Sequence, residues 1–106
     1  MQPRYASALV MGRLTSDPVY TAAADGEVAR AEFAVGDSTA RDGEYSEANP
    51  VIAHALQADA VRDSLRAGDL VWVDGKIDMR QPLDGSPRIV YATTVALMSR
   101  RKSGVR

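Results

Sequence analysis

One segment, residues 67–76, restricts the fold more than any other part of this chain. Its letters, AGDLVWVDGK, combine a glycine typical of a helix end with an alternating run of apolar and polar side chains. We expect Gly68 to end a short helix over residues 59–67 in the left-handed conformation, and residues 70–80 to form the longest strand. Gly75, in the middle of that strand, predicts a bulge or a sharp bend of the kind that barrel corners need.

Strand signals dominate the rest of the chain. Residues 19–21 can add a short extended piece, and an Asp-Gly turn at residues 24–27 leads into a strand. Alternating or β-branched runs predict four more strands, over residues 6–14, 28–35, 51–55 and 88–98. Five strands with one short helix between the third and the fourth are the order of an OB fold. We therefore predict an all-β fold, a five-stranded Greek-key barrel.

Alternation assigns the side chains of the long strand to two faces. If Val71 and Val73 point into the barrel, Trp72 points outward. An outward tryptophan has two uses: it can stack on a nucleic-acid base, or it can pack in an interface between subunits. Leu9 and Met11 likewise share one face of the first strand, which suits a strand with both faces partly covered.

The composition excludes several classes of protein. The 106 residues suffice for one domain with one modest core. The chain has no cysteine, no signal-peptide pattern and no apolar run near the roughly 20 residues of a membrane span, so we expect a cytoplasmic protein. Its single histidine, His54, cannot complete a metal site alone. Because Gly-x-Ser-x-Gly and phosphate-loop motifs are also missing, we expect no catalysis, no cofactor and no metal.

Charge is distributed unevenly along the chain. The formal net charge is −1, which argues against a strongly basic nucleic-acid binder. Four of the 13 basic residues lie within residues 100–106, which leaves nine basic against 14 acidic side chains in the rest. We therefore divide the chain into an OB-fold domain at residues 1–99 and a short basic tail at 100–106. The tail is either a frayed, solvated end or an arm that contacts phosphates.

At the level of individual residues, the chain resembles bacterial single-stranded DNA-binding proteins over about residues 7–98. The matching segments are residues 9–14 (LVMGRL) with Asp17-Pro18, residues 26–35, 58–68, 70–77 (LVWVDGKI) and 91–95. The resemblance implies an OB fold that binds single-stranded DNA without catalysis, in replication, recombination or repair. It also implies assembly as a dimer or tetramer, and replication or recombination proteins as partners. Members usually end in an acidic tip that recruits partners, whereas this chain ends in RRKSGVR, so we do not expect recruitment by that route.

The chain departs from the family in its aromatic residues. The family stacks bases on tryptophan and phenylalanine at positions where this chain has Ala40, Asn49 or Pro50, and Gln81, Pro82 or Leu83. Only His54, which aligns with a stacking phenylalanine, can take up that role. Stacking contributes about 1–3 kcal/mol per base, so the resemblance predicts weaker binding with a steeper relative salt dependence.

Eight residues form the predicted nucleic-acid site: Arg13, Arg30, Tyr45, His54, Trp72, Lys76, Arg80 and Arg88. The basic ones occupy strand positions that can line one groove, and arginine suits this role because it pairs with phosphate and stacks on bases. Tyr45 lies in a long polar loop. The alternative interpretation is that Arg30 and Arg80 only balance Glu32 and Asp78 on solvated faces. Tyr20 and Tyr91 are expected to pack in the core or in an interface.

A second function competes with DNA binding. A short barrel without an acidic tip and with few aromatic residues also resembles primosomal replication protein N, a dimeric OB-fold accessory protein. In that case the chain is a protein-interaction module with weak DNA binding. A co-purifying replication partner together with negligible DNA affinity would favour this alternative.

Overall fold

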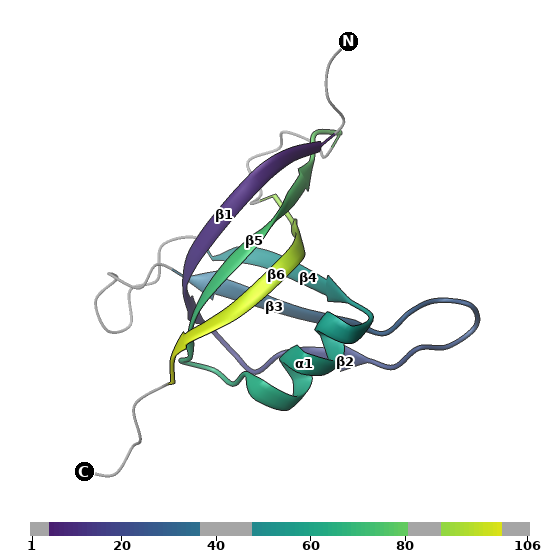
Figure 1. Cartoon of the computed structure of the whole chain (residues 1–106), viewed down its shortest axis with the longest axis horizontal. Helices are drawn as coiled ribbons and strands as arrows, with labels where there is room; N and C mark the ends of the chain where they lie inside the picture. Colours follow the sequence, from purple (N-terminus) through teal and green to yellow (C-terminus); the bar gives the residue numbers. More distant parts are fainter. Residues whose placement is uncertain (1–4, 37–47, 81–87, 101–106) are drawn as a thin grey trace.

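The computed structural model describes residues 5–36, 48–80 and 88–100 of the chain (Figure 1). Within them the elements are β1 (Tyr5–Leu14), β2 (Val19–Thr21), β3 (Arg30–Gly36), β4 (Asn49–His54), α1 (Leu56–Ser64), β5 (Leu70–Asp78) and β6 (Val90–Ser99). Among these residues, no helix has the length and apolar character that crossing a membrane would take. The last strand, β6, ends at Ser99. The last six residues of the predicted basic tail lie outside the described part, so the domain boundary at residue 99 and the tail stay predictions.

The strands close into a barrel. The sheet order is β1-β5-β6-β4-β3-β2, and the end of β1 also pairs with β3, at Arg13↔Gly36 and Leu14↔Val35. Five strands therefore form the closed ring, and β2 is a short addition beside β3. The predicted OB-fold barrel is confirmed. The helix α1 follows β4 in this numbering because the extended piece at Val19–Thr21 counts as a strand of its own.

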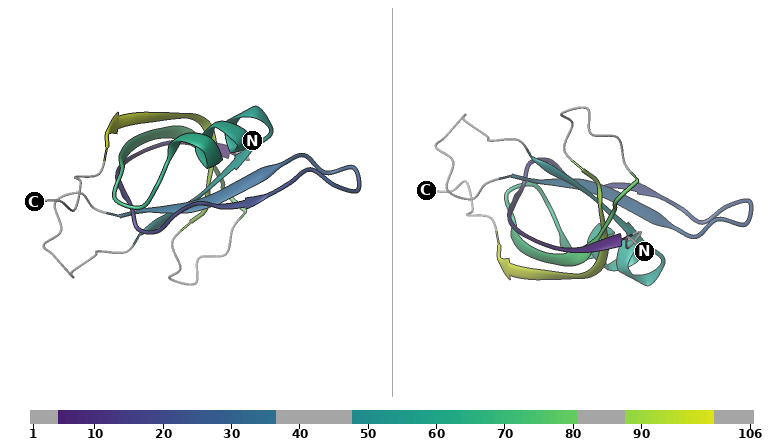
Figure 2. Two further views of the ribbon diagram at one scale, coloured as in Figure 1. Left: turned by 90° about the horizontal axis from the view of Figure 1, so that it is seen from below. Right: turned by 90° about the horizontal axis from the view of Figure 1, so that it is seen from above.

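A hairpin between β2 and β3 projects from the barrel (Figures 1 and 2). Its tip is the predicted Asp-Gly turn, with positive φ angles of 51° at Asp25 and 84° at Gly26. Ala24 and Glu27 each donate a backbone hydrogen bond to the other, of 3.1 and 2.9 Å. Both central residues need a left-handed conformation in such a turn, which Asp and Gly adopt readily.

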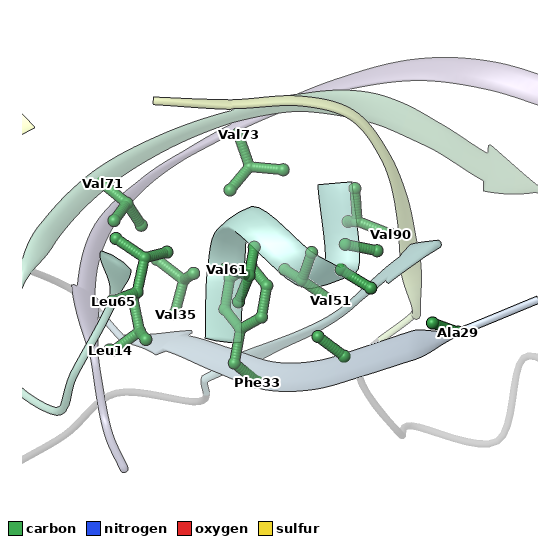
Figure 3. Close-up of a cluster of buried hydrophobic side chains, with 13 residues drawn as sticks. Leu14, Ala29, Phe33, Val35, Val51, Val61, Leu65, Val71, Val73 and Val90 are labelled. Atoms are coloured by element: carbon green, nitrogen blue, oxygen red, sulfur yellow. The ribbon is translucent and has the colours of Figure 1, made fainter. Parts of the chain in front are cut away.

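The core lies inside the barrel and against the inner face of α1 (Figure 3). Alternate residues of β3 and β5 point inward as predicted, so Val71 and Val73 are fully buried and Trp72 is half-buried on the outer side. The largest fully buried apolar side chains are all valines, at positions 35, 51, 71, 73 and 90. Branched side chains of this size fill a small barrel because they suit the pleated surface of strands.

The helix lies three residues earlier than the sequence predicted. We expected residues 59–67, whereas α1 spans Leu56–Ser64. Ala55, at φ 57°, turns the chain directly from β4 into the helix without a capping side chain, so the sequence carries no start signal there. The helix ends early because Leu65 takes an extended conformation and buries its side chain in the core.

Gly68 is left-handed, but it does not cap the helix. Its φ is 88°, and it lies in the turn that leads to β5 rather than directly after α1. The end of β1 holds this turn: Gly68 donates its backbone N–H to the Leu14 carbonyl at 2.8 Å, and Leu14 donates to the Asp69 carbonyl at 3.0 Å. The fully buried Asp69 accepts a hydrogen bond from the Arg66 N–H at 2.9 Å. Asp69 therefore stabilises the turn that leads into β5.

The predicted irregularity at Gly75 is present where β5 meets β6. The register shifts between Asp74↔Thr94 and Gly75↔Ala92, which leaves Thr93 of β6 as the extra residue. A Cβ atom at Gly75 would lie 2.4 Å from the backbone oxygen of Tyr91. Only glycine allows the two backbones to approach this closely, so Gly75 sets the position of Tyr91 on β6.

Candidate nucleic-acid interface

A row of side chains in register crosses the outer surface of the barrel. The strand pairings align Glu32 of β3 with Ile52 of β4, Ile52 with Tyr91 of β6, Tyr91 with Lys76 of β5, and Lys76 with Ser7 of β1. We call these five residues the cross-strand row. Residues aligned in register point to the same side of a sheet, and none of the five is buried. The row is therefore one continuous band across five strands.

Two predicted residues meet beside the β3 end of the row. Arg30 and His54 are aligned across β3 and β4, and both are exposed. They line a hollow of about 510 Å³ beneath the projecting hairpin. Arg30 Nε lies 3.7 Å from Glu32 Oε2, and both side chains are close to half exposed. The ion-pair alternative is therefore present, but exposed pairs contribute about 0–1 kcal/mol, so a phosphate can compete for this arginine.

Three other predicted residues gather toward the opposite end. Lys76 belongs to the row, Arg80 lies two residues after the end of β5, and Arg88 lies two residues before β6. Arg80 binds Asp78 through two hydrogen bonds, of 2.7 and 3.0 Å, which raise the pKa of the guanidinium above its ordinary value. Arg88 Nη1 contacts the sulfur of Met79 at 3.6 Å. Lys76 forms no ion pair within the described part of the chain, so its charge remains available to an anion.

The remaining predicted residues lie elsewhere. The Arg13 guanidinium donates a hydrogen bond of 2.8 Å to the Gly68 carbonyl, away from the row. Trp72 is on the outer face but aligns with Met11 and Ala96 rather than with a basic residue. Tyr45 lies outside the described residues, as do Ala40 and the turn after Arg80. The structure therefore aligns Arg30 with His54. It places Lys76, Arg80 and Arg88 at the same end of β5 and β6, with the two arginines beyond the strand ends. Arg13 and Trp72 lie apart from both groups.

Comparison with known protein families shows to which family the chain belongs. Residues 6–100 match the single-strand binding protein family. The chain belongs to this family. Binding of single-stranded DNA, the predicted function, is confirmed at the level of the family, whose members are typically non-catalytic. A search of the curated proteins finds no significant match.

Solved structures agree on the fold of this family member. Rim1, a mitochondrial single-stranded DNA-binding protein of S. cerevisiae, superposes with a TM-score of 0.70 at 16% identity, over 92% of this chain and 98% of that chain. A small single-stranded DNA-binding protein of Streptomyces coelicolor gives a TM-score of 0.62 at 21% identity, over 92% and 96%. The SSB domain of a Synechococcus protein gives 0.63 at 19% identity, over 84% and 91%. At these identities the likeness concerns the fold alone.

Sequence reasoning did not find the whole cross-strand row. Tyr91 was expected to pack in the core or in an interface; it is 36% exposed at the centre of the cross-strand row, so it is not a core residue, and packing in an interface stays a prediction. Ile52 and Ser7 were not considered. Period-two alternation alone places all three on outward positions, because Val90, Val51 and Ala8 beside them face the core. The signal that was missing is the register between strands, which joins the outward positions into one row.

A second outer region of this family member is apolar. Leu9, Met11 and Met98 are 65%, 56% and 52% exposed, and Trp72 lies beside Met11. Together with Ala96, which aligns with Trp72, we call them the apolar zone. It covers the β1–β5–β6 side of the barrel away from Lys76. We expected the face of β1 that carries Leu9 and Met11 to be partly covered, whereas in the single chain both side chains are exposed.

Acidic residues do not form a metal or acid–base centre in the described part of the chain. Asp69 is buried in its turn, Asp74 is exposed and Asp78 is held by Arg80. Among the described residues, no three His, Cys, Asp or Glu side chains gather as a metal site requires.

Proposed function

We propose that this chain binds single-stranded DNA along the cross-strand row, in the service of replication, recombination or repair. The observation that carries the proposal is the register itself. It links the Arg30–His54 pair to Lys76 across the barrel surface, and Arg80 and Arg88 follow beyond the strand ends on the Lys76 side. A backbone-tracking groove needs positive charges spaced along one path rather than a high overall charge. An acidic body with a net charge of −1 is compatible with that arrangement.

The neutral residues of the row support the same proposal. Ile52 and Tyr91 separate the two basic groups, and apolar or aromatic surface between cations is what stacked bases require. Neighbouring strands lie about 4.8 Å apart, so the path from Glu32 to Lys76 is roughly 14 Å along the sheet. One barrel would then hold only a few nucleotides, at the low end of the 4–16 that are typical of OB folds.

A titration of labelled oligo-dT followed by fluorescence anisotropy, on protein of measured mass, tests the proposal. We expect binding at low salt that weakens as salt rises, because phosphate contacts release counterions. Lys76→Ala should weaken binding and reduce the slope of log K against log salt by about 0.7, the value for one phosphate contact on a single strand. Asp74→Ala, an exposed neighbour on the same face of β5, is the matched control. Absence of binding at low salt would sink the proposal.

We also infer that the apolar zone is a subunit interface. Exposed apolar patches of this kind mark interaction surfaces, and Trp72 at its centre is the residue type that interfaces favour. This assigns Trp72 to packing between subunits rather than to base stacking. A patch that meets its own copy gives a two-fold dimer, and a second contact of that type gives a tetramer. Light scattering distinguishes these states from a monomer, and a monomer at micromolar concentration would contradict the inference.

The accessory-protein alternative is decided by the same titration. If the chain co-purifies with a replication protein and binds oligo-dT negligibly, the barrel is an interaction module rather than a DNA-binding one.

A further inference from the structure

Two tyrosines flank a hollow at the β1 end of the cross-strand row. Tyr5 of β1 and Tyr91 of β6 lie on either side of β5, and they are 44% and 36% exposed. Together with Lys76, Asp78, Ala92 and Thr93 they line a hollow of about 410 Å³. That volume falls within the range of about 300–1,000 Å³ that is common for small-ligand sites. We call it the tyrosine hollow.

The position of the Tyr91 ring is set by the backbone beneath it. Gly75 allows β6 to approach β5 so closely that a Cβ there would lie 2.4 Å from the Tyr91 oxygen. The extra residue Thr93 then turns the strand just beyond the ring. A glycine and a bulge at one point are features that re-aim a side chain. They hold Tyr91 on the outer surface, beside Lys76, instead of in the core.

The charges around the hollow suit a nucleotide. Asp78 would repel a phosphate, but Arg80 neutralises it through hydrogen bonds of 2.7 and 3.0 Å. Lys76 forms no ion pair among the described residues and aligns with Tyr91. An aromatic face next to an uncompensated cation offers one surface to a base and one to its phosphate.

We propose that the tyrosine hollow holds one nucleobase of bound single-stranded DNA, stacked on the Tyr91 ring, with the adjoining phosphate on Lys76. This proposal rests on the proposed function and makes it more specific. Tyr91 takes over part of the stacking that the chain loses where the family has tryptophan and phenylalanine. Tyr5 closes the other side of the hollow and limits it to a single base.

The test compares two strands of equal length and charge, oligo-dT and an abasic oligonucleotide. Tyr91→Ala should weaken binding of oligo-dT about 5- to 150-fold, the equivalent of one stacked base, and leave the abasic strand within about twofold. Tyr91→Phe keeps the ring and should bind both strands like the unaltered protein. Thr94→Ala, an exposed position on β6 outside the hollow, is the matched control. Circular dichroism confirms that each variant is folded.

A second measurement needs no variant. Photo-crosslinking of the unaltered protein to oligo-dT that carries 5-iodouracil should yield a peptide modified at Tyr91 or Tyr5. Crosslinks confined to other residues, or an equal loss of oligo-dT and abasic binding in Tyr91→Ala, would overturn the tyrosine hollow while the proposed function stands. If the unaltered protein binds neither strand at low salt, the proposed function fails and the hollow fails with it.

Discussion

Single residues decide how closely the strands of this barrel approach, and Gly75 is the sharpest case. Replacing it with alanine would bring a Cβ to 2.4 Å from the Tyr91 oxygen and 3.0 Å from a Val90 methyl. The first contact is with backbone, so relief requires β6 to move. We expect Gly75→Ala to lower the free energy of unfolding by about 1–3 kcal/mol, the usual effect of overpacking. Thermal denaturation followed by circular dichroism measures it.

The matched control for that change lies one residue away. Asp74 is exposed on the same strand, so Asp74→Ala should stay within about 0.5 kcal/mol of the unaltered protein. If Gly75→Ala were as stable as this control, the close approach of β5 and β6 would not be needed for the fold. The inference that Gly75 sets the position of Tyr91 would then fail as well.

Among the elements, the turn between α1 and β5 is held by the end of β1. Arg13 Nη1 donates to the Gly68 carbonyl at 2.8 Å, and Asp17 accepts from the Ala67 N–H at 2.8 Å. Leu14 accepts from the Gly68 N–H and donates to the Asp69 carbonyl. These contacts join two segments about fifty residues apart in sequence. Arg13 therefore acts on the fold, although its residue type had suggested a phosphate contact.

The contrast between Arg13 and Lys76 is testable. Arg13→Ala should lower stability by about 1–2 kcal/mol, as expected for a hydrogen bond from a charged group to a partly buried carbonyl, and change oligo-dT affinity little. Lys76→Ala should leave stability almost unchanged and weaken oligo-dT binding, because Lys76 is exposed and makes no structural ion pair among the described residues. Urea denaturation and anisotropy titration on both variants give the two readouts. A larger loss of DNA affinity in Arg13→Ala than in Lys76→Ala would contradict this division.

Elements differ in how well the sequence predicts them. Strand faces follow from local alternation, so the inward Val71 and Val73 and the bulge at Gly75 were predicted correctly. The helix was displaced by three residues because Ala55 starts it through a positive φ that no residue type announces. The candidate site was harder to predict than the elements, since a cross-strand row depends on pairing between strands as far apart in sequence as β1 and β5. The sequence shows on which strands the basic residues lie, but only the register between strands shows which of them share a surface.

At the scale of the whole molecule, the row and the apolar zone occupy different parts of the same outer surface. Lys76 and Tyr91 lie toward one end of β5 and β6, and Trp72 and Met98 toward the other. Assembly through the apolar zone would leave the row on each subunit accessible. Several weak rows joined in one particle can hold a long strand far more tightly than one row, because each further contact is intramolecular. This offsets the small number of stacking rings in each barrel.

Met11→Glu tests that coupling, because a buried charge in a self-complementary interface is repeated on both subunits. We expect the variant to be monomeric by light scattering and to bind a strand long enough for several barrels about 100-fold more weakly, the lower limit of typical avidity gains. Its affinity for a strand of about six nucleotides, which fits one OB fold, should not change. Leu56→Glu, at a position 83% exposed on α1, is the control and should keep both the assembly and the long-strand affinity. Equal weakening on short and long strands would mean that the zone belongs to the DNA site itself, and Trp72 would then return to the list of residues that contact bases.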